Sequence, residues 1–162
     1  MRIVVIGVII LLVVYLLITY IFSDRKVIRS KILRSDANPN DKTVDSKNIP
    51  FKEGTTDFTV SFWLYIETYK NNGGLEYNII QKYTDNNNLF LISLNNQRND
   101  INFKLKTVNS DSPIQRLTLE NIYLQKWNNI IMTVETRNLD IYLNGKLEET
   151  LVLDSLVDNN IN

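Results

Sequence analysis

The feature that most constrains the fold is an apolar run near the N-terminus. From Ile3 to Phe22 the chain carries no charged side chain, and only Thr19 and two tyrosines bring hydroxyl groups. At 1.5 Å per residue, about 20 helical residues span the ~30 Å hydrocarbon core of a bilayer. We therefore expect one N-terminal transmembrane α-helix, with a lipid bilayer as the partner of residues 3–22.

A secretory signal peptide is the alternative interpretation of this run. The apolar core of such a peptide is about 7–15 residues long and ends at a small-residue cleavage site. Here the run is longer and continues into Tyr20-Ile21-Phe22-Ser23-Asp24, which has no such pattern. The sequence therefore favours an uncleaved anchor over residues 1–23.

The segment after the anchor is basic. Five Lys and Arg residues lie between Arg25 and Arg34, whereas only Arg2 and the α-amine precede the run. Positive residues stay preferentially on the cytoplasmic side of a membrane, and they are also attracted to anionic headgroups. The sequence predicts a single-pass membrane protein with its globular domain on the cytoplasmic side, joined by a basic juxtamembrane segment and polar linker over residues 24–48.

Charge and composition exclude several kinds of site. The 18 basic and 18 acidic residues give zero net charge and a pI near 6.3, so no basic field indicates nucleic-acid binding. The chain has no cysteine, which excludes disulfides, thiolate metal sites and cysteine nucleophiles. It also has no histidine, so proton transfer near neutral pH would fall to carboxylates, lysines or tyrosines.

Beyond Pro50 the pattern is that of β-strands. Residues 58–66 alternate, with Phe58 and every second residue to Ile66 on one face. The opposite face begins with Thr59 and ends in Trp63 and Tyr65. A strand buried on one face and partly covered on the other is expected to be central in its sheet. Because of their size and strand positions, both tryptophans, Trp63 and Trp127, are expected to pack in the core.

Further strand-like runs follow, each bounded by Asn, Asp, Gly, Ser or Pro: 77–83, 89–94, 101–108, 114–119 and 130–134. Within Leu139–Leu147, the pair Asn144-Gly145 predicts a hairpin with a two-residue type I′ turn, because both central residues of that turn need positive φ. Short strands at this spacing, with no helical pattern after the anchor, predict an antiparallel all-β sandwich or jelly roll.

Three of these segments carry a family resemblance. Asp57–Trp63 (DFTVSFW), Gln125–Val134 (QKWNNIIMTV) and Leu139–Leu147 (LDIYLNGKL) resemble strands of the laminin-G-like jelly rolls in the concanavalin A-like lectin/glucanase superfamily. The resemblance covers residues 51–153 and implies a jelly-roll domain over residues 49–162. Its motif positions are Phe58, Phe62, Trp63, Trp127, Tyr142, Asn144 and Gly145.

Two further features follow from the resemblance. An N-terminal anchor joined to such a domain is similar to membrane proteins of large double-stranded DNA viruses, and the Asn-, Ile- and Lys-rich composition suits that source. Family members continue beyond the hairpin with two more strands, whereas this sequence ends at Asn162. The domain is therefore expected to lack its last two strands, leaving a position beside Asp57–Trp63 for the N-terminal segment or a partner's strand, unless the sequence is a fragment.

The acidic residues do not form the pattern of a hydrolase. Glucanases of the superfamily carry two catalytic carboxylates in an E-x-D-x-x-E strand, which places both on one face. Here Glu67, Glu76 and Glu120 are isolated, and Glu148 and Glu149 are adjacent, so they point to opposite faces of a strand. We expect no enzymatic activity.

Candidate binding residues lie in Asn-rich loops and nearby tyrosines. A glycan would need aromatic rings beside amides, which these residues supply: Tyr65, Tyr69, Tyr83, Asn86, Asn87 and Asn88. Laminin-G and pentraxin relatives bind Ca²⁺ in oxygen-rich loops, and the resemblance gives Asp85, Asn87 and Asp111 as possible ligands. Asn-rich turns also form for conformational reasons alone, so no cofactor is expected and Ca²⁺ is the alternative.

Two functions follow. The first is non-enzymatic recognition of a glycan or glycoprotein at a membrane surface. The second is a structural role as a viral membrane protein that tethers an internal membrane, of the virion or of the host, to capsid or partner proteins. The fold favours the first by analogy. The basic flank favours the second, because a lectin for host glycans should face outward.

Overall fold

The computed structural model describes residues 10–18, 56–68, 75–84, 87–109, 111 and 113–158. The chain divides into two units, Met1–Pro50 and Phe51–Asn162, and each is described by itself. In the first unit, residues 10–18 are α-helical with exposed apolar side chains. Among the described residues, no helix has both the length and the apolar character to cross a bilayer. Residues 3–9 and 19–22 of the predicted span lie outside the described part of the chain.

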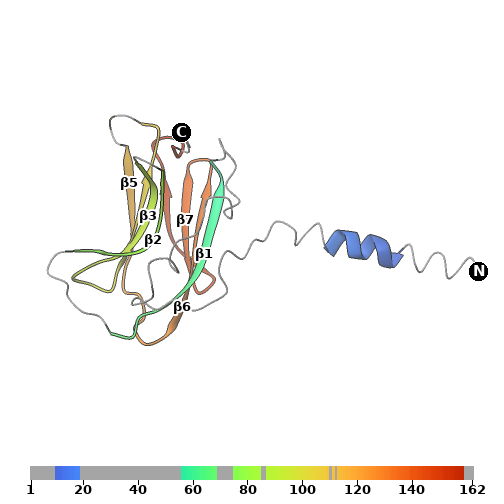
Figure 1. Ribbon diagram of the computed structural model, residues 1–162, viewed down its shortest axis with the longest axis horizontal. Helices are drawn as coiled ribbons and strands as arrows, with labels where there is room; N and C mark the ends of the chain where they lie inside the picture. The colour runs from blue at the N-terminus through green and yellow to red at the C-terminus, as the bar shows by residue number, and fades with distance from the viewer. Residues whose placement is uncertain are drawn as a thin grey trace, which may run out of the picture. The chain divides into compact units, whose positions relative to one another are not determined.

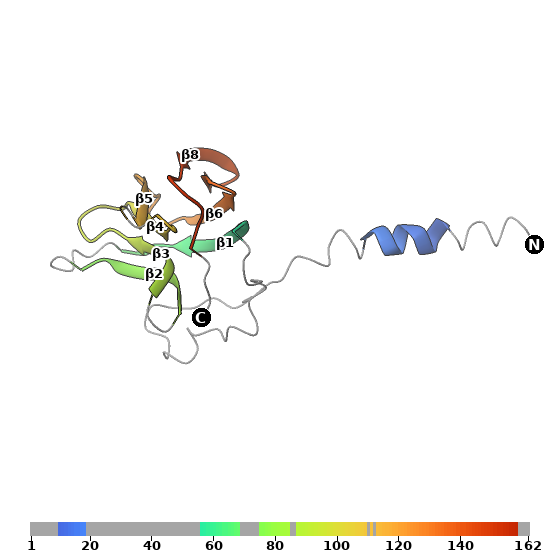
Figure 2. The same cartoon turned by 90° about the horizontal axis from the view of Figure 1, so that it is seen from above.

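The second unit is a sandwich of two antiparallel four-stranded sheets (Figure 1). Sheet A has the order β1 (Phe58–Tyr65), β6 (Trp127–Glu135), β7 (Asn138–Leu143), β8 (Lys146–Val152). Sheet B has the order β2 (Tyr77–Thr84), β3 (Asn87–Leu94), β4 (Ile101–Lys106), β5 (Ile114–Leu119). Figure 2 shows the two layers from above. The predicted all-β sandwich is confirmed, and all predicted strands occur within a few residues of their expected bounds.

The core lies between the two inner faces. Successive side chains of a strand point to opposite faces, and burial alternates accordingly along β4 and β6. The fully buried inward side chains include Phe103 of β4, Met132 of β6 and Ile141 of β7. Strand β1 adds half-buried side chains to the same cluster: Phe58, Val60, Phe62 and Leu64. This packing explains why the alternating pattern was visible in the sequence.

The β7–β8 hairpin turns at Asn144 and Gly145, whose φ angles are +53° and +85°. Both are positive, as the predicted two-residue turn requires. The turn is also tied to β6, because the Asn129 N–H donates to Asn144 Oδ1 at 2.9 Å and the Asn144 N–H donates to the Asn129 carbonyl at 2.8 Å. The hairpin prediction is therefore confirmed.

Two expectations about sheet A are wrong. Among the described residues β1 pairs with β6 alone, so it lies at the edge of sheet A and not at its centre. Trp63 and Trp127 are 65% and 49% exposed instead of packed in the core. Their side chains point to the outer face of sheet A, which no other described strand covers. Large aromatic residues on that face made β1 resemble a strand covered on both sides.

Candidate functional site

The outer face of sheet B carries rows of polar side chains. The strand register places four small polar residues side by side across the sheet: Asn78, Ser93, Asn102 and Thr118. The neighbouring row contains Gln81, Leu91, Lys104 and Arg116. On β4 and β5 these positions alternate with the more buried residues of the same strand. On β2 a register shift between Asn78 and Ile80 lets Asn78 and Gln81, three residues apart, lie on the same face.

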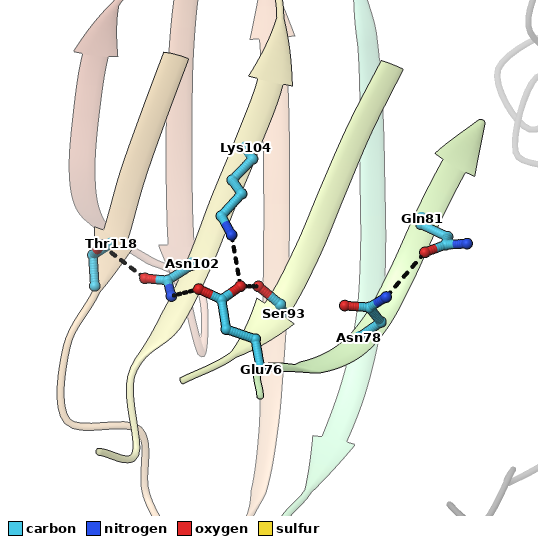
Figure 3. Close-up of polar contacts among 7 residues, drawn as sticks. All are labelled: Glu76, Asn78, Gln81, Ser93, Asn102, Lys104 and Thr118. Carbon is cyan, nitrogen blue, oxygen red and sulfur yellow. Dashed lines mark hydrogen bonds and ion pairs between the residues drawn. The ribbon is translucent and has the colours of Figure 1, made fainter. Parts of the chain in front are cut away.

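The side chain of Glu76, just before β2, joins three of these residues (Figure 3). Its Oε2 accepts hydrogen bonds from Ser93 Oγ at 2.6 Å and Lys104 Nζ at 2.7 Å. Its Oε1 accepts one from Asn102 Nδ2 at 3.1 Å. Thr118 Oγ1 in turn donates to Asn102 Oδ1 at 3.0 Å. We call these five residues the Glu76 network; it joins the start of β2 to β3, β4 and β5.

The network holds Glu76 as a carboxylate. Burial by itself raises the pKa of Glu76, but the hydrogen bonds from Lys104 and Ser93, the positive charge of Lys104 and the hydrogen bond from Asn102 together lower it below its ordinary value. The Glu76 side chain is 31% exposed and the Lys104 side chain 22%. The ion pair is therefore fixed by its neighbours yet still reachable from solvent.

Exposed hydrogen-bonding groups surround the network. Asn78 Nδ2 donates to Gln81 Oε1 at 3.1 Å on the β2 side (Figure 3). Arg116 and Thr118 are exposed on the β5 side. The face thus offers carboxylate and amide acceptors beside amide, hydroxyl and cationic donors. Such a mixture suits a ligand that is rich in hydroxyl groups.

The comparison with known families agrees with this architecture. The family model for a laminin G-type domain, described as the concanavalin A-like lectin/glucanases superfamily, matches residues 38–161, more than half of the chain. The chain belongs to this superfamily. Laminin G-like domains bind glycans or proteins, which points to a binding role for this domain.

The Glu76 network differs from the catalytic site of a concanavalin A-like glucanase. Glycoside hydrolysis needs two carboxyl groups about 5–9.5 Å apart. The network in Figure 3 contains one carboxylate, and both of its oxygens already accept hydrogen bonds. What this arrangement can do chemically is hold a ligand by hydrogen bonds and charge.

The structure describes only part of the predicted glycan-binding set. Tyr65 is exposed on sheet A, whereas Tyr83 pairs with Asn88 on sheet B. Asn87 also lies in β3, next to this pair. The side chains of Tyr83, Asn87 and Asn88 are not among those described, and Tyr69 and Asn86 lie outside the described residues. Tyr65 lies apart from Tyr83, Asn87 and Asn88 because β1 belongs to sheet A, whereas β2 and β3 belong to sheet B. Glycan binding by the predicted set stays a prediction.

The predicted Ca²⁺ ligands are described only in part. Asp85 lies outside the described residues, as does the side chain of Asn87. Asp111 is exposed, and its N–H donates to Asn109 Oδ1 at 3.0 Å. The register places the β2–β3 hairpin and the β4–β5 connection at the same end of sheet B. No group of three or more acidic side chains suited to a metal ion occurs within the described ranges. Calcium binding stays a prediction.

Sequence reasoning missed the Glu76 network. Glu76 was interpreted as isolated because its partners lie 17–28 positions away along the chain. One signal was present: Asn102 and Lys104 alternate with apolar residues on β4, which marks an outward polar face. The sequence alone could not supply the register that places Glu76 over that face.

Proposed function

We propose that this protein is a non-enzymatic, membrane-anchored binding protein that recognises a glycan, free or on a glycoprotein, through the outer face of sheet B. The observation that supports this most directly is the Glu76 network. A carboxylate fixed by donors from two neighbouring strands, and linked through Asn102 to a third, is an ordered acceptor for sugar hydroxyls. Strands hold these groups in place, so little side-chain freedom would be lost on binding.

The direct test is glycan binding by the full-length chain held in detergent micelles. A glycan array is screened with and without Ca²⁺, and the best ligand is then titrated against wild type and Glu76→Gln. Hydrogen bonds to a charged group contribute about 1.5–3 kcal/mol, so affinity should fall about 10- to 150-fold. Because Gln keeps the shape of Glu76, this loss would report the charge.

Glu148→Gln is the matched control. Glu148 also forms an ion pair, with Lys146 Nζ at 3.1 Å, but it lies on β8 of sheet A. Binding should be unchanged in this variant. A wild-type chain that binds no glycan on the array, in either Ca²⁺ condition, would rule the proposal out.

The membrane anchor is the second part of the proposal. It is supported by the uncharged run from Ile3 to Phe22 and by the basic residues from Arg25 to Arg34. These basic residues favour a domain on the cytoplasmic side. Protease treatment of sealed vesicles whose cytoplasmic face points inward tests this sidedness, because a cytoplasmic domain would be protected from the added protease.

The same basic flank favours a second candidate function. A domain on the cytoplasmic side would be placed to tether an internal membrane, of a virion or its host, to capsid or other proteins. Cross-linking in membranes or particles distinguishes the two. Reproducible protein neighbours together with silence on the glycan array would support the tether.

A further inference from the structure

We propose that the domain carries a second contact surface, on sheet A, that docks on the headgroup region of the bilayer spanned by its own anchor. This inference rests on the anchor in the function proposed above. The surface consists of Trp63, Tyr65 and Trp127 together with Tyr123 and Leu124 from the β5–β6 connection. We call it the aromatic ledge.

Two aromatic rings meet where β1 ends and β6 begins, and a third lies on the same face. Tyr65 is the cross-strand partner of Trp127, and their ring centroids are 5.4 Å apart. Trp63 lies two residues before Tyr65 on β1 and so points to the same outer face. The three side chains are between 44% and 65% exposed. Exposed apolar groups gathered in one patch indicate an interaction surface, unlike scattered ones.

The adjoining loop is held firmly against the ledge. The Gln125 N–H donates to the Ile66 carbonyl at 2.8 Å, just past the end of β1. Asn128 Nδ2 donates to the Tyr123 carbonyl at 2.9 Å, and Ile122 is fully buried. These contacts leave Tyr123 and Leu124 exposed on a fixed backbone. The ledge is thus a built feature of the fold.

Its chemistry matches a membrane interface. Tryptophan and tyrosine concentrate at headgroup level because each has an apolar ring and a polar tip. Lysine beside them can extend its charge into water, and Lys126 Nζ lies 5.7 Å from the centre of the Tyr123 ring. Two acidic residues are close to the ledge along the chain: Glu67 follows Ile66, and Glu120 is the first residue of the β5–β6 connection. One lysine beside two glutamates favours a zwitterionic headgroup over an anionic one. The choline of such a headgroup can also bind over aromatic rings.

The bilayer is the partner we assign to the ledge, because the chain itself connects the domain to the predicted membrane span. At no more than about 3.6 Å per residue, the chain from Phe22 to Phe58 keeps β1 within about 130 Å of the predicted span. Docking is then intramolecular, so a weak contact suffices to be populated. A glycan or a protein would have to reach the ledge from solution.

The two tryptophans of the chain, Trp63 and Trp127, both lie on the ledge, so tryptophan fluorescence reports this surface alone. The full-length chain is reconstituted into phosphatidylcholine vesicles with or without lipids brominated near the headgroups. We expect emission shifted to shorter wavelength and quenched by the brominated lipid. The double variant Tyr123→Ser, Leu124→Ser should lose both effects. Val152→Ser should keep them, since Val152 is equally exposed but at the far end of β8.

Flotation of the vesicles separates failure of the anchor from failure of the ledge. A chain that does not float overturns the anchor and this inference with it. A chain that floats but emits like a water-exposed indole, unquenched, overturns the ledge contact and leaves the anchor standing. A wavelength shift without quenching would mean that the tryptophans are covered by a second copy of the chain or by another partner. That result would also overturn the lipid contact.

Discussion

Asn128 offers a sharp test of how the β5–β6 connection is held. Its side chain is fully buried, and Nδ2 donates to the carbonyls of Tyr123 at 2.9 Å and Lys126 at 3.0 Å, with a longer contact to Leu64 at 3.5 Å. Replacing Asn128 by aspartate keeps the shape but turns this donor into an acceptor. The substitution therefore opposes the hydrogen bonds without creating a cavity.

The magnitude follows from what the amide contributes. Asn128→Ala loses two well-formed hydrogen bonds and should cost about 1–3 kcal/mol of unfolding free energy. Asn128→Asp places a carboxylate in the same buried position against three carbonyl oxygens, which should cost several kcal/mol at neutral pH. For a domain of this size, each kcal/mol lowers Tm by about 4–8 °C.

Thermal unfolding of the full-length chain, followed by circular dichroism at several pH values, measures these costs. In the Asn128→Asp variant, burial would raise the pKa of the introduced carboxyl group in the folded state above its unfolded value. The folded state would then bind more protons, so the variant should regain stability as pH falls through that raised pKa. Asn138→Asp, at an exposed position of β7, should stay within about 0.5 kcal/mol of wild type. An Asn128→Asp variant as stable as Asn128→Ala at neutral pH would refute the assigned hydrogen bonds.

Three further outcomes are expected. Because the folded pKa of Glu76 is lowered, its stabilisation is present above its unfolded pKa of about 4.3 and is lost as pH falls through the folded value. In acid titrations, the difference in unfolding free energy between wild type and Glu76→Gln should therefore shrink as pH falls below the unfolded pKa. A difference that stays constant with pH would contradict the network. Phe103→Ala empties a fully buried position and should cost about 3–5 kcal/mol in urea unfolding. Gly145→Ala meets no atom within 4 Å, so only its φ of +85° opposes the change. Its cost should be about 1 kcal/mol, and a much larger loss would indicate a hidden steric contact.

The sequence by itself determined the strands and one turn. Alternation along β1, β4 and β6 is a local property, set by the opposite directions of neighbouring side chains, and it survives in the structure as alternating burial. The Asn144-Gly145 turn was equally local, because positive φ at both residues is a property of those residues alone. The strand spacing predicted a sandwich or jelly roll, and the family motifs added the resemblance to the laminin-G-like superfamily.

The tertiary structure alone decided which faces are covered and which polar groups meet. Trp63 and Trp127 were expected in the core because size and strand position indicate burial, yet burial depends on whether another layer lies over that face. Glu76 was expected to be isolated, yet the register of β3 and β4 brings Ser93, Asn102 and Lys104 to its carboxylate. Both outcomes depend on contacts between segments far apart in the chain, which a pattern of period two cannot encode. The candidate binding face and the aromatic ledge are products of that long-range pairing.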